Sequence, residues 1–371
     1  MPTQQQGPVF DSSEYRVIDC DYHQMDSFKQ IAEYMPEPWR TKFERSGWGD
    51  SGVNQALASF FPSSTGDRFA YGKIEREHSS YPHETEDPDQ IRDAMAELDL
   101  DATILISHLV LASAGISADD EREAAFVKGY IEHVLAEAVV DPDDGVYALA
   151  PIPYYDIDHS LDVLDRIEGE DAFVGGCFIT AGAVPPLGNR KYDPIYERLE
   201  EMGLPVVYHT GGSGLDEYLS AGYEEMVETH TLGFLQSNMA QQVSVTCQGV
   251  PVKFPDLDIV FMESGVAYIP GLMARLDEEY LKRPEEAPLL EKRPSKYITE
   301  YYFGTQPLEV SADPDFLENC IRTIGTEQLL YASDYPHWDF DSPRIITELP
   351  FLSNEERAQI LGDNATKVFG I

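Results

Sequence analysis

Val17-Ile18-Asp19-Cys20-Asp21-Tyr22-His23 is the stretch from which the predicted fold is built. It begins as a short apolar run and ends in polar residues, which is typical of a buried strand whose end carries a site. Residues two apart on a strand point to the same face, so Asp21 and His23 are expected to lie side by side. A carboxylate oxygen beside an imidazole nitrogen can bind zinc, manganese or iron.

A long polar and aromatic segment, about residues 24–88, follows this first strand. Ordinary loops are much shorter, so the segment is interpreted as an insertion with short helices. It is expected to form either a lid or substrate wall, or plain surface structure. From residue 89 onward the pattern becomes regular, and helices alternate with apolar runs. Further strands are predicted at residues 102–107, 146–152, 173–179, 205–209, 257–263, 301–304 and 329–334.

Eight strands, each followed by a helix or a long connection, predict an α/β chain that forms one (β/α)8 TIM barrel over residues 1–371. The strand cores are apolar on both sides, as in parallel sheets that are covered on both faces. A doubly wound open sheet is the alternative. The barrel is favoured because polar residues stand at the C-terminal ends of predicted strands 1, 5, 6 and 8: Asp21, His23, His209, Glu263 and Asp334.

In a barrel these strand ends meet at one mouth, where the chemistry of such folds takes place. Taken alone, His209 could equally be a hydrogen-bonded histidine of the core rather than a metal ligand, and Asp334 could cap a turn. Together, two histidines and two acids form a mixed nitrogen and oxygen set suited to a catalytic divalent ion with open positions. The sequence therefore predicts one such ion, with zinc favoured over manganese and iron.

The composition excludes some partners. The chain has 371 residues, with 67 Asp plus Glu against 26 Lys plus Arg and a formal net charge of -41. Such a surface repels nucleic acid and anionic membranes, so a small-molecule substrate is expected instead. The acidic residues are spread along the whole chain, which favours a halophilic protein adapted to high salt over simple solubility.

Cysteine use and hydropathy predict a cytoplasmic protein. The four cysteines are far apart in the sequence and form no CxxC pair, which fits buried thiols in a reducing compartment. The first seven residues are polar and lack an apolar signal core. No apolar run approaches the roughly 20 residues that a membrane helix needs.

The motifs around these residues resemble the amidohydrolase-related metal-dependent enzymes, in the branch of aminocarboxymuconate-semialdehyde decarboxylase and the resorcylate decarboxylases. The resemblance covers essentially the whole chain and implies a TIM barrel. It rests on Ile18-Asp-Cys-Asp-Tyr-His23, Val207-Tyr-His-Thr210, Met262-Glu-Ser-Gly265 with Pro270 and Arg275, Leu330-Tyr-Ala-Ser-Asp-Tyr-Pro-His337, and Asn364-Ala-Thr-Lys-Val-Phe-Gly370.

The resemblance implies a role for each matching residue. His23 matches a first-strand metal ligand, and Asp21 takes a position where many members have His and some have Glu. His209 matches the strand-5 ligand and Asp334 the strand-8 aspartate. Metal binding is thus implied for Asp21, His23, His209 and Asp334, and barrels of this family are often dimers or larger, so a homo-oligomer is expected.

Glu263 departs from the family, which usually has a histidine at this position. A glutamate can ligate the ion or act as acid or base, but it cannot supply a neutral imidazole donor. The favoured hypothesis is a hydrolase of an amide, ester or lactone, in which a metal-activated water is deprotonated by Asp334 and Glu263 protonates the leaving group. The alternatives are a non-oxidative decarboxylase and a catalytically silent barrel that binds a small molecule. In the enzyme hypotheses the catalytic residues are Asp334, Glu263 and His209.

Four further residues are candidates for substrate binding: Arg275, His337, Trp338 and His108. Arg275 follows strand 6 and could reach an anionic substrate, or it could pair with carboxylates of its own helix. His337 and Trp338 follow Asp334 and are expected to line the pocket or to pack in the loop. His108 follows strand 2 and could face the same mouth.

Overall fold

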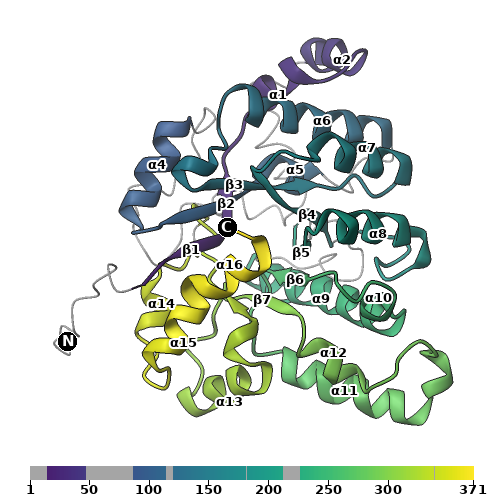
Figure 1. Ribbon diagram of the computed structural model, residues 1–371, viewed down its shortest axis with the longest axis vertical. Coiled ribbons are helices and arrows are strands. Elements are labelled where there is room, and N and C mark those ends of the chain that lie inside the picture. Colours follow the sequence, from purple (N-terminus) through teal and green to yellow (C-terminus); the bar gives the residue numbers. More distant parts are fainter. Residues whose placement is uncertain (1–14, 47–86, 114–119, 181, 212–225, 338) are drawn as a thin grey trace.

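The computed structural model describes residues 15–46, 87–113, 120–180, 182–211, 226–337 and 339–371. Eight parallel strands form a single sheet in the order β1 to β8. Figure 1 shows the strands at the centre of the molecule with the helices around them. The strands are β1 (Ile18–Gln24), β2 (Ala102–Ser107), β3 (Val146–Pro151), β4 (Phe173–Ile179), β5 (Val206–His209), β6 (Ile259–Met262), β7 (Tyr302–Gly304) and β8 (Leu329–Leu330).

Helices follow the strands around the barrel, as the alternation in the sequence predicts. In chain order they are α1 (Phe28–Tyr34), α2 (Trp39–Ser46), α4 (Pro88–Glu97), α5 (His108–Ser113), α6 (Asp120–Ala136), α7 (Ile157–Ile167), α8 (Asp193–Met202), α9 (Met226–Cys247), α10 (Val250–Lys253), α11 (Ile269–Lys282), α12 (Pro294–Ile298), α13 (Pro314–Ile324), α14 (Arg344–Thr347), α15 (Asn354–Ala358) and α16 (Asn364–Phe369). None of the helices described here is long and apolar enough for a membrane span.

The barrel closes between its first and last strands. Cys20 N–H donates to the Tyr331 carbonyl at 3.0 Å, and His23 N–H donates to the Tyr335 carbonyl at 2.7 Å. The chain after β8 therefore turns toward β1, and this is why the predicted strand 329–334 has only two residues with regular pairing to β7. The predicted TIM barrel is confirmed.

The predicted insertion is only partly described. Its first part forms α1 and α2, and α2 places Phe43 against Phe126 of α6 with ring centroids 6.1 Å apart. Residues 47–86 lie outside the described residues, so a lid or substrate wall there stays a prediction.

An aromatic row on the outer face of the barrel fixes which strand residues point inward. Phe178, Tyr208, Phe261 and Phe303 are in register on β4 to β7, and the Tyr208 and Phe261 ring centroids are 4.7 Å apart. The Tyr208 hydroxyl donates to the Tyr196 hydroxyl on α8, so Tyr208 faces the helices. Because side chains alternate along a strand, His209, the residue after Tyr208 on β5, faces the interior of the barrel.

Where the end of the chain packs against the start of β1, one glycine has no room for a side chain. Gly362 lies in the π-helical turn Gln359–Asp363, and a Cβ added there would lie 2.3 Å from the Arg16 carbonyl oxygen, just before β1. Gly362→Ala should lower the free energy of unfolding by about 1–3 kcal/mol through overpacking. Gly271→Ala is the control, because its Cβ meets nothing within 4 Å in α11 and should stabilise by up to about 1 kcal/mol. Urea unfolding of both variants tests this, and equal stabilities would contradict it.

Candidate metal centre

β1 and β5 bring together the first two parts of the site. His209 is the last residue of β5, and its Nε2 lies 3.0 Å from Asp21 Oδ1. The other ring nitrogen, Nδ1, contacts the Thr210 carbonyl oxygen, to which only an N–H can donate. This contact assigns a proton to Nδ1, so Nε2 is the ring nitrogen that would bind a cation, as expected of a metal-binding histidine.

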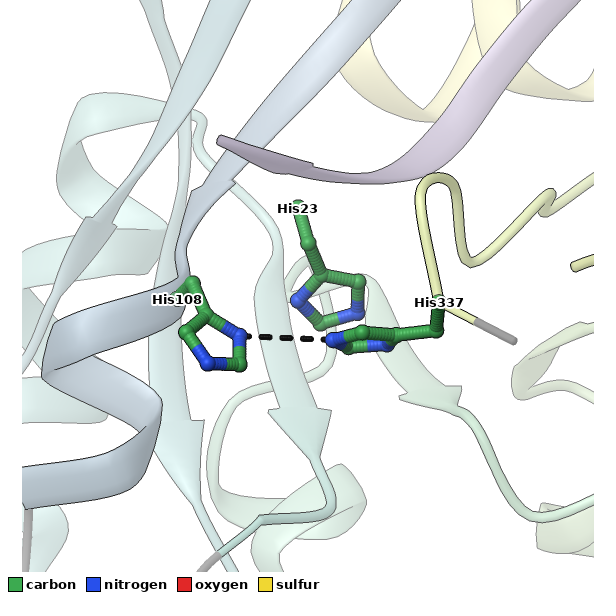
Figure 2. A group of neighbouring side chains, drawn as sticks. All are labelled: His23, His108 and His337. Carbon is green, nitrogen blue, oxygen red and sulfur yellow. Dashed lines mark hydrogen bonds between the residues drawn. The ribbon is translucent and has the colours of Figure 1, made fainter. Parts of the chain in front are cut away.

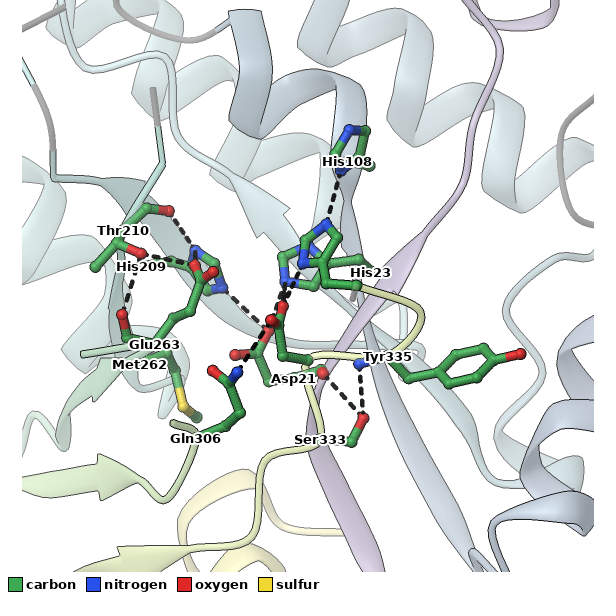
Figure 3. A network of polar contacts seen from close by, with 12 residues as sticks. Asp21, His23, His108, His209, Thr210, Met262, Glu263, Gln306, Ser333 and Tyr335 are labelled. Carbon is green, nitrogen blue, oxygen red and sulfur yellow. Dashed lines mark hydrogen bonds and ion pairs between the residues drawn. The ribbon is translucent and has the colours of Figure 1, made fainter. Parts of the chain in front are cut away.

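His23 joins the same group from β1, as the two-residue spacing predicts. Its Nε2 lies 3.3 Å from Asp21 Oδ1 and 2.8 Å from Asp334 Oδ1. Groups from the two ends of the chain and from its middle thus meet at one mouth of the barrel, as predicted (Figure 3). All four residues, Asp21, His23, His209 and Asp334, are buried.

Asp334 is held in position by side chains from two segments and by its own backbone. Gln306, two residues beyond β7, donates from Nε2 to Asp334 Oδ2 at 3.1 Å, and His337 Nδ1 contacts Asp334 Oδ1. The Asp334 N–H donates to the Asp21 carbonyl at 2.9 Å. Asp334 has φ 60°, a left-handed conformation that non-glycine residues adopt rarely and mainly where the surroundings impose it.

Glu263 follows β6 and also has a left-handed backbone, with φ 56°. The Thr210 hydroxyl donates to Glu263 Oε2 at 2.6 Å. Burial, and then the negative charge of Asp334, raise the pKa of Glu263 well above its ordinary value. Burial therefore favours the protonated form of Glu263, and because Thr210 binds Oε2, the proton is expected on Oε1.

The other carboxylates of the site have different protonation tendencies. Burial opposes ionisation of Asp21, but the charges of His209 and His23 outweigh it and lower the pKa of Asp21. Burial, followed by the charges of Asp339 and Asp21, raises the pKa of Asp334 well above its ordinary value. A cation bound between these groups would relieve that repulsion.

Unpartnered buried atoms show that the group fits a cation. Within the described part of the chain, Asp21 Oδ2 and His23 Nδ1 have no hydrogen-bond partner. Buried polar atoms are rarely left without partners, and each such atom costs free energy. Asp21, His23 and His209 offer ligand atoms that all lie within 4.8 Å of one another. Their donors, two imidazoles and a carboxylate, suit a divalent ion.

Asp19 is a site residue that the sequence analysis missed. Its Oδ1 accepts hydrogen bonds from the Ser333 N–H at 2.8 Å and the Asp21 N–H at 3.1 Å, and it thereby ties β1 to the segment that carries Asp334. Asp19 precedes Asp21 by two residues, but the pairing of β1 with β2 is irregular between Asp19 and Tyr22, so strand alternation alone does not place its side chain. Thr210, which directly follows β5, and Gln306, which lies two residues beyond β7, were also missed.

Asp19 gives a pH-dependent prediction for the metal-free protein. Burial raises the pKa of Asp19 from 3.8 to about 6, although hydrogen bonds from Ser333 and Asp21 lower it in part. The folded state therefore binds the proton more tightly than the unfolded state, and this stabilisation is lost as the pH rises from about 4 through 6. As the pH rises from 4 to 7, the free energy of unfolding of Asp19→Asn should increase by up to about 3 kcal/mol relative to that of the wild type. Urea unfolding across this range tests it, and a constant difference would contradict it.

Two of the four predicted substrate-binding residues, His108 and His337, lie next to the site. His108 begins α5, and its Nδ1 lies 3.3 Å from His337 Nε2 next to the site. Burial, and then the neighbouring imidazoles of His23 and His108, lower the pKa of His337 well below its ordinary value, so this ring is neutral. Trp338 lies outside the described residues.

Arg275 does not join the buried group. Its side chain is 74% exposed on α11 and pairs with Glu279 at 2.9 Å. The alternative considered for this residue, a salt bridge within its own helix, describes the observed contact. Such an exposed pair contributes little to stability.

Comparisons with known proteins identify the family. The sequence model of the amidohydrolase family matches residues 18–371. The gamma-resorcylate decarboxylase of Rhizobium sp. (strain MTP-10005) is 23% identical over 259 residues, which cover 67% of this chain and 78% of that protein. The resemblance to the resorcylate decarboxylase branch is thereby confirmed.

Solved structures share the fold. An amidohydrolase from Mycobacterium avium subsp. paratuberculosis K-10 superposes with a TM-score of 0.74 at 20% identity, covering 96% of this chain and 99% of that one. A mutant 5-carboxyvanillate decarboxylase from Novosphingobium aromaticivorans, with bound manganese, gives a TM-score of 0.70 at 19% identity, covering 97% and 99%.

Proposed function

The chain belongs to the amidohydrolase family, and from this premise we propose that it is a metal-dependent, non-oxidative decarboxylase of small hydroxylated aromatic carboxylates. Two kinds of observation support the proposal. Curated relatives that match across most of their own length are decarboxylases. The site also combines a group suited to a cation with a buried carboxyl group, that of Glu263, whose pKa is raised by burial.

The resident cation is proposed to bind Asp21, His23, His209 and Asp334. Two carboxylates and two imidazoles suit either manganese or zinc, and the manganese bound in the Novosphingobium enzyme favours manganese over the zinc expected from the sequence. When bound, the ion supplies positive charge for the substrate's carboxylate and a neighbouring oxygen, and it holds the departing group in line.

The protein's residues would move the proton. When the bond between the ring and the carboxylate breaks, its electron pair stays on the ring carbon and carbon dioxide leaves. Glu263 then donates the proton of Oε1 to that carbon, and its carboxylate is reprotonated from solvent. The observation that carries the proposal is the position of this acid: Glu263, His23, Asp334 and His337 offer polar atoms that all lie within 4.8 Å of one another.

Hydrolysis, which the sequence analysis favoured, ranks second. A protonated Glu263 would serve as the acid for a leaving group, but a hydrolase also needs a base for water, and the raised pKa of Asp334 opposes that role in the metal-free protein. No observation beyond family membership favours it. The catalytically silent barrel ranks third.

Product analysis tests the proposal. The purified protein with added manganese is incubated with 2,6-dihydroxybenzoate and 5-carboxyvanillate, and in parallel with their methyl esters and with simple lactones. Carbon dioxide release from the free acids, without acid release from esters or lactones, is expected. Hydrolysis without carbon dioxide would establish the hydrolase instead, and bound metal without either product would favour the silent barrel.

A further inference from the structure

A second group of imidazoles lies beside the proposed metal site. His108 at the start of α5 and His337 on the segment after β8 both approach His23 on β1 (Figure 2). The His23 and His337 ring centroids are 4.1 Å apart, and those of His108 and His337 are 5.3 Å apart. The three residues offer ring nitrogens that all lie within 4.8 Å of one another.

The distance between two of these nitrogens suits a shared ion. Ligand nitrogens bind zinc at about 2.0–2.1 Å, so two of them on one tetrahedral ion are about 3.4 Å apart. His108 Nδ1 and His337 Nε2 are 3.3 Å apart. His337 Nδ1 contacts the carboxyl group of Asp334, so Nε2 is the ring nitrogen that faces His108. A carboxylate that orients a histidine in this way is common around metal ions.

His23 supplies an independent observation. It is completely buried, and although its Nε2 lies 2.8 Å from Asp334 Oδ1, its Nδ1 has no hydrogen-bond partner among the described residues. A histidine that binds a single ion normally donates its other N–H to a neighbour. His23 instead has a second ring nitrogen available, and it is common to the group with Asp21 and His209 and to the group with His108 and His337.

We propose that His23, His108 and His337 bind a second divalent cation, with the imidazole of His23 between the two ions. This inference goes beyond the proposed function, since it concerns an additional metal site and requires no particular reaction. An all-imidazole donor set favours zinc, cobalt, nickel or copper over manganese. The first site, with its two carboxylates, accepts manganese, so the two sites are expected to differ in the ions they take.

Metal counting tests the proposal without a substrate. The full chain is stripped with chelator, dialysed to equilibrium against zinc chloride, and analysed for zinc per chain. We expect two zinc ions in the wild type, and one when manganese chloride is the probe. His108→Phe keeps a ring in the same place but lacks nitrogens, and it should bind one zinc ion and still one manganese ion.

A single zinc ion in the saturated wild type, or two in His108→Phe, would overturn the proposal. Circular dichroism shows whether the variant is folded, and His108→Asn takes its place if it is not. Cobalt chloride gives a second readout, because two occupied sites produce visible absorption that saturates at two equivalents in the wild type and at one in either variant. Since no substrate is used, failure to release carbon dioxide would leave this result unaffected.

Discussion

The Asp21→Ala/His209→Ala variant is expected to lose one divalent ion per chain and all measurable carbon dioxide release. Asp21 Oδ1 lies 3.0 Å from His209 Nε2 and 3.3 Å from His23 Nε2, so the double substitution removes two of the three donors that face one another there. Loss of a group that merely orients a ligand already lowers affinity about 10–100-fold, and the loss of two ligands exceeds this. Metal analysis after dialysis and carbon dioxide measurement on the same sample test it.

A matched control separates metal loss from general damage. Asp89→Ala/His159→Ala removes the same two residue types from the outer helices α4 and α7, where Asp89 is 96% exposed at its side chain. This control should keep its metal and its activity. If the Asp21/His209 variant retained a full complement of metal while folded, these residues would not be ligands and the metal-dependent mechanism would be wrong.

Residues far apart in the chain could be assigned to this site from the sequence because a parallel barrel has simple rules. Strand periodicity places Asp21 and His23 on one face, and the C-terminal ends of all strands meet at one mouth. Asp21 and His209 are separated by 188 positions, yet their contact follows from these two rules alone. Asp19 is different, because the pairing of β1 with β2 is irregular between Asp19 and Tyr22.

The remaining features depend on backbone conformation that periodicity does not encode. Asp334 and Glu263 both leave their strands in the left-handed region, which turns each side chain toward the mouth. The strand predicted through residue 334 ends at Leu330 because the chain there pairs with β1. The contact between His108, at the start of α5, and His337, on the segment after β8, is predicted by no spacing rule.

The sequence favours hydrolysis and the structure favours decarboxylation, and this difference also depends on properties of the folded chain. Hydrolysis was favoured because Glu263 replaces the histidine usual in the family. Whether Glu263 carries a proton depends on its burial and on its proximity to Asp334, and both are properties of the folded chain. A protonated glutamic acid can replace an imidazolium as a proton donor, so the substitution is compatible with decarboxylation.

Glu263→Gln is expected to lower kcat for carbon dioxide release by about 10²–10⁴-fold, the range typical of a lost general acid. Glutamine keeps the shape of the side chain and can still accept the hydrogen bond from Thr210, but it cannot give a proton to carbon. Metal content should stay at the wild-type value, and KM should change little. Steady-state kinetics and metal analysis on the same preparation measure these quantities.

Thr210→Val tests whether Glu263 acts through its proton. The Thr210 hydroxyl donates to Glu263 Oε2 at 2.6 Å, and a donor to a carboxylate stabilises its charged form. Without it the pKa of Glu263 should rise further. Glu263 must be protonated to act, so activity is lost as the pH rises through its pKa, and in Thr210→Val this alkaline limb of kcat should move to higher pH. A limb that does not move would mean that another group donates the proton.

The two variants together distinguish an acid from a ligand. If Glu263 bound the ion, Glu263→Gln would lose metal and its activity would recover at higher manganese concentrations, because added ion compensates for weaker binding. An acid cannot be restored in this way, so the loss of kcat should persist at saturating manganese. Retained metal, a persistent loss of kcat and a shifted alkaline limb in Thr210→Val can be explained together only by proton donation from Glu263.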